Sequence, residues 1–150
     1  MSCLRKFVDW TFAKIPQKKL SPAQWQSIKV VAHRGAHENN MAKENTLPAF
    51  QWCLNKKIWG VEFDIRWTED NVPVVHHDSH CGRIFQRPDI EISHYPWQKL
   101  HKELPDLPSL QQVLTACSHQ LHLMIELKTV LTIHQESILT ELLNEYQPGK

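Results

Sequence analysis

Two kinds of hydrophobic pattern alternate in the first half of the chain. Residues 30–32 form a short apolar run before Gly35, which suits a buried strand and is too short for a helix. An N-cap at Asn45 or Thr46 and a nearby proline then begin a helix. Its apolar face is formed by residues at helical spacing: Leu47, Phe50, Leu54 and Ile58. Gly60 ends this helix, and a second strand is predicted to follow.

The second strand, residues 61–67, is predicted to have one polar and one apolar face. Side chains two residues apart share a face, so Glu62, Asp64 and Arg66 point away from the apolar residues between them. Carboxylates are costly to bury without a partner. This face of the strand is therefore expected to contact a cation.

A hairpin is predicted after this strand. Asp70 and Asn71 suit a two-residue turn, since both tolerate positive φ. A turn centred there pairs Asp64 with His77, which places an imidazole beside the two acids. A bulge at the following proline could shift this pairing by one residue. The neighbouring histidine, His76, would face the other way and is expected to be structural.

The second half continues the alternation of strands and helices. Residues 78–107 form a long connection with three prolines, and loops of this size are usually functional or ordered by an insert. Ser109 is the predicted N-cap of a helix, followed by a strand over 121–128 and a helix over 132–146. This order predicts an α/β layer with parallel strands.

The N-terminal segment, residues 1–27, is assigned separately from the domain at 28–150. Apolar residues between positions 4 and 15 recur at helical spacing, and Pro16 ends the predicted helix. We expect this helix to pack on the domain. A membrane-surface helix is the alternative, which Asp9 and the short length disfavour.

Composition narrows the classes of function. The chain has 150 residues, 41% of them hydrophobic and 22% charged, which is typical of a soluble globular protein. Its net charge of +1 argues against a nucleic-acid partner. Four cysteines without paired spacing favour a reducing, cytoplasmic location. We find no signal peptide and no apolar run that predicts a transmembrane segment.

Four ordered motifs then suggest a family. H-R-G-A, E-N-T-L-P-A-F, G-V-E-F-D-I-R-W-T and V-P-V-V-H-H-D resemble the glycerophosphodiester phosphodiesterases, and similar blocks follow at 107–110 and 123–128. The resemblance covers residues 28 to about 128 and implies a TIM (β/α) barrel of the phospholipase-C-like type. Such a barrel has eight strands in about 250 residues. We therefore expect the N-terminal part of a barrel, that is, a partial barrel.

The resemblance also implies roles for particular residues. It makes Glu62, Asp64 and Glu126 the metal ligands, and carboxylate oxygens suit Ca²⁺ or Mg²⁺. It makes His33 and His77 the general acid and base, in an order that the sequence does not decide. The remaining candidates are Arg34 and Lys128 as phosphate contacts, and Glu44 and Asn45 as residues that support the site.

The implied activity is hydrolysis of glycerophosphodiesters to glycerol 3-phosphate and an alcohol. The alternatives are a lysophospholipase D-like or related phosphodiesterase, and an inactive remnant that binds anions or metal. A partial barrel would leave strand 121–128 with an open edge, so self-association or a complementing chain is expected.

Overall fold

The computed structural model describes residues 19–37 and 42–146. The helix predicted between positions 4 and 15 lies outside these residues. The N-terminal segment contains one described helix, α2 (Pro22–Ser27), which begins with a capping box between Ser21 and Gln24.

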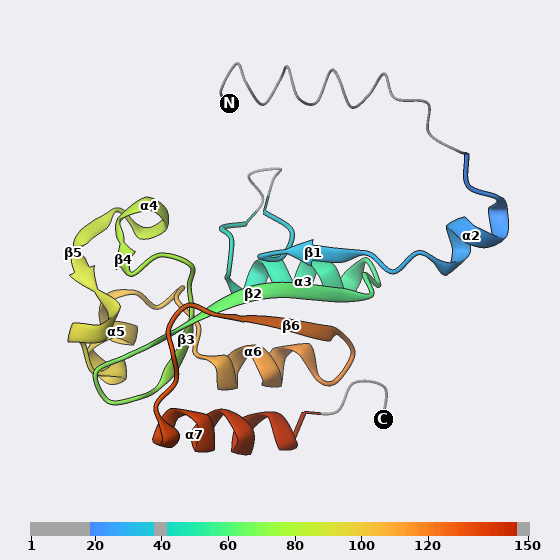
Figure 1. Ribbon diagram of the computed structural model, residues 1–150. Coiled ribbons are helices and arrows are strands. Elements are labelled where there is room, and N and C mark those ends of the chain that lie inside the picture. The colour runs from blue at the N-terminus through green and yellow to red at the C-terminus, as the bar shows by residue number, and fades with distance from the viewer. Residues whose placement is uncertain (1–18, 38–41, 147–150) are drawn as a thin grey trace.

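The main sheet has four described strands, and three of them are parallel. β2 (Gly60–Trp67) lies between β1 (Val31–His33) and β6 (His122–Leu127), and both pair with it in parallel. β3 (Pro73–Val75) turns back and pairs antiparallel with the last residues of β2. Figure 1 shows the three parallel strands side by side, with their carboxyl ends at the same end of the molecule. The predicted α/β fold with parallel strands is confirmed.

Helices cover the apolar face of this sheet. α3 (Leu47–Asn55), α6 (Leu110–Cys117) and α7 (Ile133–Asn144) are the helices of this layer. The buried core between helices and sheet includes Phe50, Cys53, Val61, Phe63, Ile65, Val113, Leu114 and Cys117. The alternation predicted for β2 is therefore confirmed, since its apolar residues enter this core. The N-cap predicted at Ser109 is also present, and it forms a capping box with Gln112.

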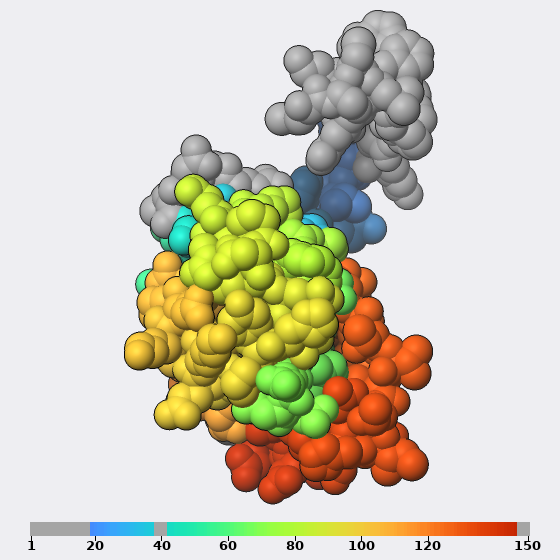
Figure 2. Space-filling view, turned by 90° about the vertical axis from the view of Figure 1, so that its left-hand side faces the viewer, coloured from blue at the N-terminus to red at the C-terminus, as the bar shows by residue number. Residues whose placement is uncertain are grey.

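The long connection after β3 is an ordered insert. It contains β4 (His80–Cys81), α4 (Gly82–Phe85), β5 (Arg87–Glu91), the 3₁₀ helix η1 (Ile92–His94) and α5 (Trp97–Glu103). A second buried core joins the insert to β3 and includes Val74, Cys81, Ile90, Ile92, Leu100, Leu104 and Leu107. Figures 1 and 2 show the insert at the end of the molecule where the strands of the main sheet terminate.

The predicted hairpin register is wrong by one residue. Ile65 pairs with Val75 and Trp67 with Pro73, so Asp64 lies opposite His76 rather than His77. The amide of His76 donates to the carbonyl oxygen of Asp64 at 3.0 Å. The connection is a five-residue loop over 68–72 instead of a two-residue turn. The insert shapes this loop, because the amide of Trp97 donates to Asp70 Oδ1 at 2.9 Å.

Both outer strands of the parallel sheet have a free edge within the described residues. β1 and β6 each pair with β2 and with no other described strand. Large apolar side chains near these edges are exposed: Val30, Met124 and Leu127. Among the described residues, no helix combines the length and the apolar character that crossing a bilayer requires.

Candidate active site

Three carboxylates meet on the polar face of the sheet. Glu62 and Asp64 lie on β2, and Glu126 lies on β6 directly beside Asp64 in the parallel register. One oxygen from each carboxylate lies within 4.8 Å of the others. Asp64 is fully buried, whereas the side chain of Glu126 is 54% exposed. The period-two alternation of two neighbouring strands brings these side chains to one face.

This donor set fits a divalent cation. Three negative groups so close together repel one another unless positive charge lies between them. Carboxylate oxygens on a rigid sheet are ligands that Ca²⁺ and Mg²⁺ accept. Glu62, Asp64 and Glu126 are therefore the residues that would hold a metal.

Two cations of the chain already contact Asp64. Lys128 Nζ lies 2.9 Å from Asp64 Oδ1 and also contacts Glu126, and Arg34 Nε lies 3.3 Å from Asp64 Oδ2. The amide of Asn45 donates to the same Oδ2 at 3.0 Å. Burial alone would raise the pKa of Asp64, but the contacts with Lys128, Asn45 and Arg34 outweigh it and lower the pKa. The buried carboxyl group is therefore ionised.

The turn after β1 places Arg34 at this cluster in an unusual conformation. Arg34 has a φ of 54°, a region that a residue with a side chain enters at a cost. Its amide donates to the carbonyl oxygen of Glu62 at 2.7 Å, which ties the turn to β2. Gly35 follows with a φ of 77°, and a Cβ there would lie 2.8 Å from that of Ala49. The H-R-G motif is thus a tight turn packed on α3.

The two histidines predicted as acid and base lie in different surroundings. The ring of His33 is 68% exposed, and its Nε2 lies 3.8 Å from Glu62 Oε2. His77 is partly buried, and its Nδ1 lies 2.7 Å from Asp78 Oδ1. The guanidinium of Arg66 donates two hydrogen bonds to the carbonyl oxygen of His77, at 2.8 and 3.0 Å. Because the register is shifted, His77 does not lie opposite the acids.

His76 takes the position opposite Asp64 but is enclosed by protein. It is 1% exposed, and its Nε2 lies 3.3 Å from the carbonyl oxygen of His80. Burial lowers its pKa, and the charge of Arg83 also acts in this direction. The structural role of His76 stays a prediction.

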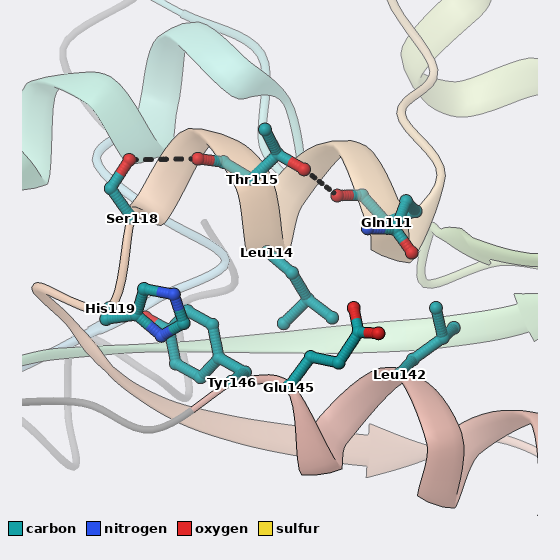
Figure 3. Close-up of a pocket in the computed structure, with 8 residues that line it drawn as sticks. All are labelled: Gln111, Leu114, Thr115, Ser118, His119, Leu142, Glu145 and Tyr146. Atoms are coloured by element: carbon teal, nitrogen blue, oxygen red, sulfur yellow. Dashed lines mark hydrogen bonds between the residues drawn. The ribbon is translucent and has the colours of Figure 1, made fainter. Parts of the chain in front are cut away.

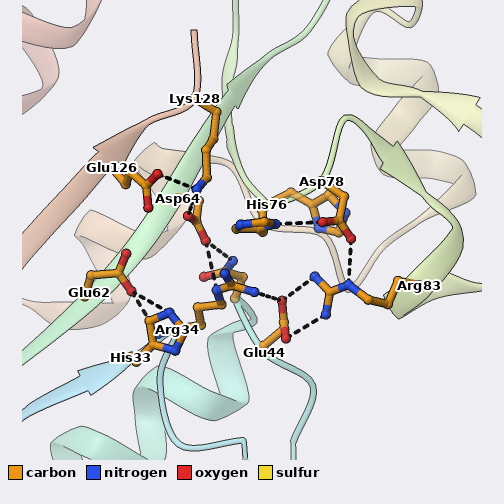
Figure 4. Close-up of polar contacts among 12 residues, drawn as sticks. His33, Arg34, Glu44, Glu62, Asp64, His76, Asp78, Arg83, Glu126 and Lys128 are labelled. Carbon is orange, nitrogen blue, oxygen red and sulfur yellow. Dashed lines mark hydrogen bonds and ion pairs between the residues drawn. The ribbon is translucent and has the colours of Figure 1, made fainter. Parts of the chain in front are cut away.

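Glu44 connects the cluster to residues that the sequence interpretation missed. It accepts a hydrogen bond from Arg34 Nη1 at 3.0 Å and two from Arg83, at 2.8 and 2.9 Å (Figure 4). Burial alone would raise the pKa of Glu44, but the two arginines lower it. Arg83 also binds Asp78, the neighbour of His77. The only signal in the sequence was that Asp78 and Arg83 closely follow the histidine pair.

A cavity of about 410 Å³ lies at the same end of the strands. Arg66 and Thr129, which line it, are close in sequence to Asp64 and Lys128, and Glu91 from the insert forms another wall. A second cavity, of about 310 Å³, lies between α6 and α7 and contains none of the site residues (Figure 3). There the hydroxyl of Tyr146 donates to the carbonyl oxygen of Leu121, before the start of β6. None of the predicted site residues lines either of these two cavities.

Both the sequence and the fold are similar to those of known proteins. The model of the Glycerophosphoryl diester phosphodiesterase family matches residues 33–146. Glycerophosphodiester phosphodiesterase 1 of Rattus norvegicus is 28% identical over a match that covers 79% of this chain and 40% of the rat protein.

Two solved structures extend the similarity to the fold. Glycerophosphodiester phosphodiesterase from Thermotoga maritima superposes with a TM-score of 0.69 and 26% identity, over 79% of this chain and 50% of that one. An Oleispira antarctica phosphodiesterase in complex with the product sn-glycerol-3-phosphate superposes with a TM-score of 0.66 and 25% identity, over 85% of this chain and 56% of that one. The chain thus spans less than two thirds of the length of each of these relatives.

Proposed function

The chain belongs to the glycerophosphoryl diester phosphodiesterase family, its fold is part of a TIM barrel, and we propose that it acts in metal-dependent hydrolysis of glycerophosphodiesters. The products would be glycerol 3-phosphate and an alcohol. The carboxylate cluster of Glu62, Asp64 and Glu126 carries this proposal, because it offers three hard oxygen ligands within 4.8 Å of one another. The relative bound to sn-glycerol-3-phosphate supports a small-molecule substrate.

The polar residues of the site divide into those that would bind the metal or the phosphate and those that would transfer protons. Glu62, Asp64 and Glu126 would hold Ca²⁺ or Mg²⁺. A divalent cation supplies positive charge to the phosphoryl oxygens as negative charge develops there. Arg34 and Lys128 are the cations of the chain nearest to this point, and each can donate hydrogen bonds to a phosphate.

His33 and His77 are proposed to move the two protons. One imidazole takes the proton of the neighbouring glycerol hydroxyl as its oxygen forms a new P–O bond, and the other gives a proton to the leaving alkoxide as the old P–O bond breaks. Water then opens the resulting cyclic phosphate, which gives glycerol 3-phosphate. Asp78 binds Nδ1 of His77, and no described residue donates to or accepts from its Nε2, so this nitrogen is available for proton transfer.

A metal-binding module without turnover is the second candidate. The described sheet contributes three parallel strands, whereas a TIM barrel uses eight. The three carboxylates come from β2 and β6 alone, so cation binding does not need the remaining strands. Substrate binding and proton transfer would depend more strongly on the other walls of a barrel.

One set of measurements separates these candidates. The chain is stripped with a chelator and titrated with Ca²⁺ or Mg²⁺ by calorimetry, and release of glycerol 3-phosphate from glycerophosphocholine is then measured. We expect each metal to bind, and turnover to disappear with chelator and return with metal. Turnover of lysophosphatidylcholine in place of glycerophosphocholine would favour the lysophospholipase D-like alternative. Binding without turnover of either would favour the module.

Glu126→Gln and Glu62→Gln test the ligand assignment. Glu126 is half exposed, so its replacement should leave the fold intact while metal affinity falls by at least about tenfold, since one ligand charge is lost. The double variant Glu136→Gln, Glu141→Gln on the exposed side of α7 changes charge away from the site and is the control. Unchanged affinity in both ligand variants contradicts the proposed site.

A further inference from the structure

Arg83 binds two carboxylates that come from different parts of the chain. It lies in α4 of the insert, and its Nε donates to Asp78 Oδ2 at 2.7 Å. Its Nη1 and Nη2 donate to the two oxygens of Glu44 at 2.9 and 2.8 Å, in a bidentate arrangement. Glu44 lies in the loop between β1 and α3. Arg83 thus fastens the insert to two segments that reach the site (Figure 4).

Each of these carboxylates contacts a residue with a proposed role. Asp78 Oδ1 lies 2.7 Å from His77 Nδ1, while its other oxygen is bound to Arg83. Glu44 Oε1 accepts from Arg34 Nη1 at 3.0 Å, and Arg34 in turn contacts Asp64. Arg83 is therefore one residue removed from both His77 and Arg34, and among the described residues no hydrogen bond or ion pair joins it to either of them.

A carboxylate bound at Nδ1 determines which nitrogen of an imidazole can accept a proton. When Nδ1–H donates to a carboxylate, the proton stays on Nδ1 and the lone pair of Nε2 becomes the reactive one. A carboxylate fixed at its second oxygen cannot rotate away from the ring, and a planar guanidinium supplies that restraint better than a flexible ammonium group. Asp78 is well suited to hold the ring in this way. Although burial alone would raise its pKa, Arg83 and His77 lower the pKa to about 2.

We propose that Arg83 is a positioning residue of the active site. By holding Asp78 it keeps His77 in the tautomer with its proton on Nδ1, and by holding Glu44 it keeps Arg34 against Asp64. The importance of this role for catalysis rests on the function proposed above. The state of the His77 ring can nevertheless be measured without any turnover.

Arg87 provides a matched control in the same insert. It also forms charged hydrogen bonds with two carboxylates, through Nη2 to Asp89 and Glu103 at 2.7 and 2.8 Å. Neither of these partners contacts a residue of the site among the described contacts. If Arg83 only attached the insert to the rest of the chain, loss of Arg83 would leave the His77 ring unchanged, as loss of Arg87 should.

The experiment records long-range ¹H–¹⁵N correlation spectra of the histidine rings. The full chain is labelled with ¹⁵N, the His77 signals are assigned with His77→Gln, and spectra are taken at about pH 8, above the ordinary histidine pKa of ~6.5. The wild type should show one His77 tautomer with the proton on Nδ1. Arg83→Gln and Asp78→Asn should both shift it toward a mixture, and Arg87→Gln should not.

Activity then tests the catalytic consequence. Arg83→Gln should lower kcat by about 10- to 100-fold, as loss of an outer partner of a site commonly does, and Arg83→Lys should restore part of it. A folded Arg83→Gln variant with an unchanged His77 spectrum overturns the proposal, whatever its activity. If that variant does not fold, the same spectrum is recorded for Arg83→Lys. Lysine lacks the planar fork, so the His77 signal should shift there too, and an unchanged signal overturns the proposal. If the wild-type chain itself has no turnover but Arg83→Gln shifts the His77 signal, the positioning role is supported and the proposed function is contradicted.

Discussion

His33 and His77 are the residues for which a change should affect chemistry with little effect on the fold. Both rings are partly exposed, at 68% and 32%. Replacing either by alanine should lower turnover by about 10²- to 10⁴-fold, the usual contribution of a positioned proton-transfer group. His134→Ala on α7 is the control. Equal losses in that control, or full activity in His77→Ala, would show that the assignment is wrong.

His76 should affect stability instead, with a definite dependence on pH. Burial lowers its pKa in the folded chain, and the charge of Arg83 adds to this effect. The carbonyl of His80 and the charges of Asp78 and Glu44 oppose it in part. The unfolded chain therefore binds the proton more readily than the folded chain. The free energy of unfolding should fall as pH drops below ~6.5, by at most about 1.4 kcal/mol per pH unit from this group.

Urea unfolding midpoints of the wild type and His76→Gln at pH 7.5 and 5.5 measure this effect. Glutamine cannot take up the proton, so the difference between the two pH values should be smaller in the variant. An equal or larger difference in His76→Gln would contradict the lowered pKa expected for the buried His76.

At the level of elements, the N-terminal cap of α6 can be tested separately from the active site. The hydroxyl of Ser109 accepts from the amide of Gln112, and the side chain of Gln112 accepts from the amide of Ser109. Ser109→Ala removes half of this capping box and should lower the free energy of unfolding by about 1 kcal/mol. Thr115→Ala on the exposed face of the same helix is the control and should change stability by less than about 0.5 kcal/mol. Denaturant unfolding followed by circular dichroism compares the two variants, and equal midpoints would mean that the cap contributes little.

At the scale of the molecule, the sheet has open strand edges within the described residues, and they should govern the behaviour of the chain in solution. β1 and β6 each lack a partner on their outer side in the described sheet, and Met124 and Leu127 on β6 are 53% and 44% exposed. Unpaired backbone beside apolar side chains favours pairing between chains. We expect the isolated 150-residue chain to self-associate as its concentration rises.

Sedimentation of the double variant Met124→Lys, Leu127→Lys tests this expectation. Charges on β6 should shift the chain toward monomer, as charged residues on edge strands do in natural proteins. Ile133→Lys, on an exposed apolar residue of α7 away from the strand edges, should leave the association unchanged. A wild-type chain that is monomeric at high micromolar concentration would contradict the role of the open edge.

Features that depend on neighbours along the chain could be predicted from the sequence alone. The two faces of β2 follow from the period of a strand, so the positions of Glu62 and Asp64 on a common face were predictable. The cap at Ser109 follows from local hydrogen bonds. The order of strands and helices, together with the motifs, was sufficient to predict an α/β layer and the family.

Features that depend on distant segments required the folded chain. The hairpin register follows from the loop over 68–72, which the insert holds through Trp97 and through the carbonyl of Tyr95 bound to the amide of Glu69. No local turn rule includes that contact. The bond from Arg83 to Glu44 joins two segments that only folding brings together, and the ion pair of Lys128 with Asp64 exists because β6 lies beside β2. The residue types at the site were thus predictable from local periodicity and motifs, whereas their electrostatic partners depend on the packing of segments far apart in the chain.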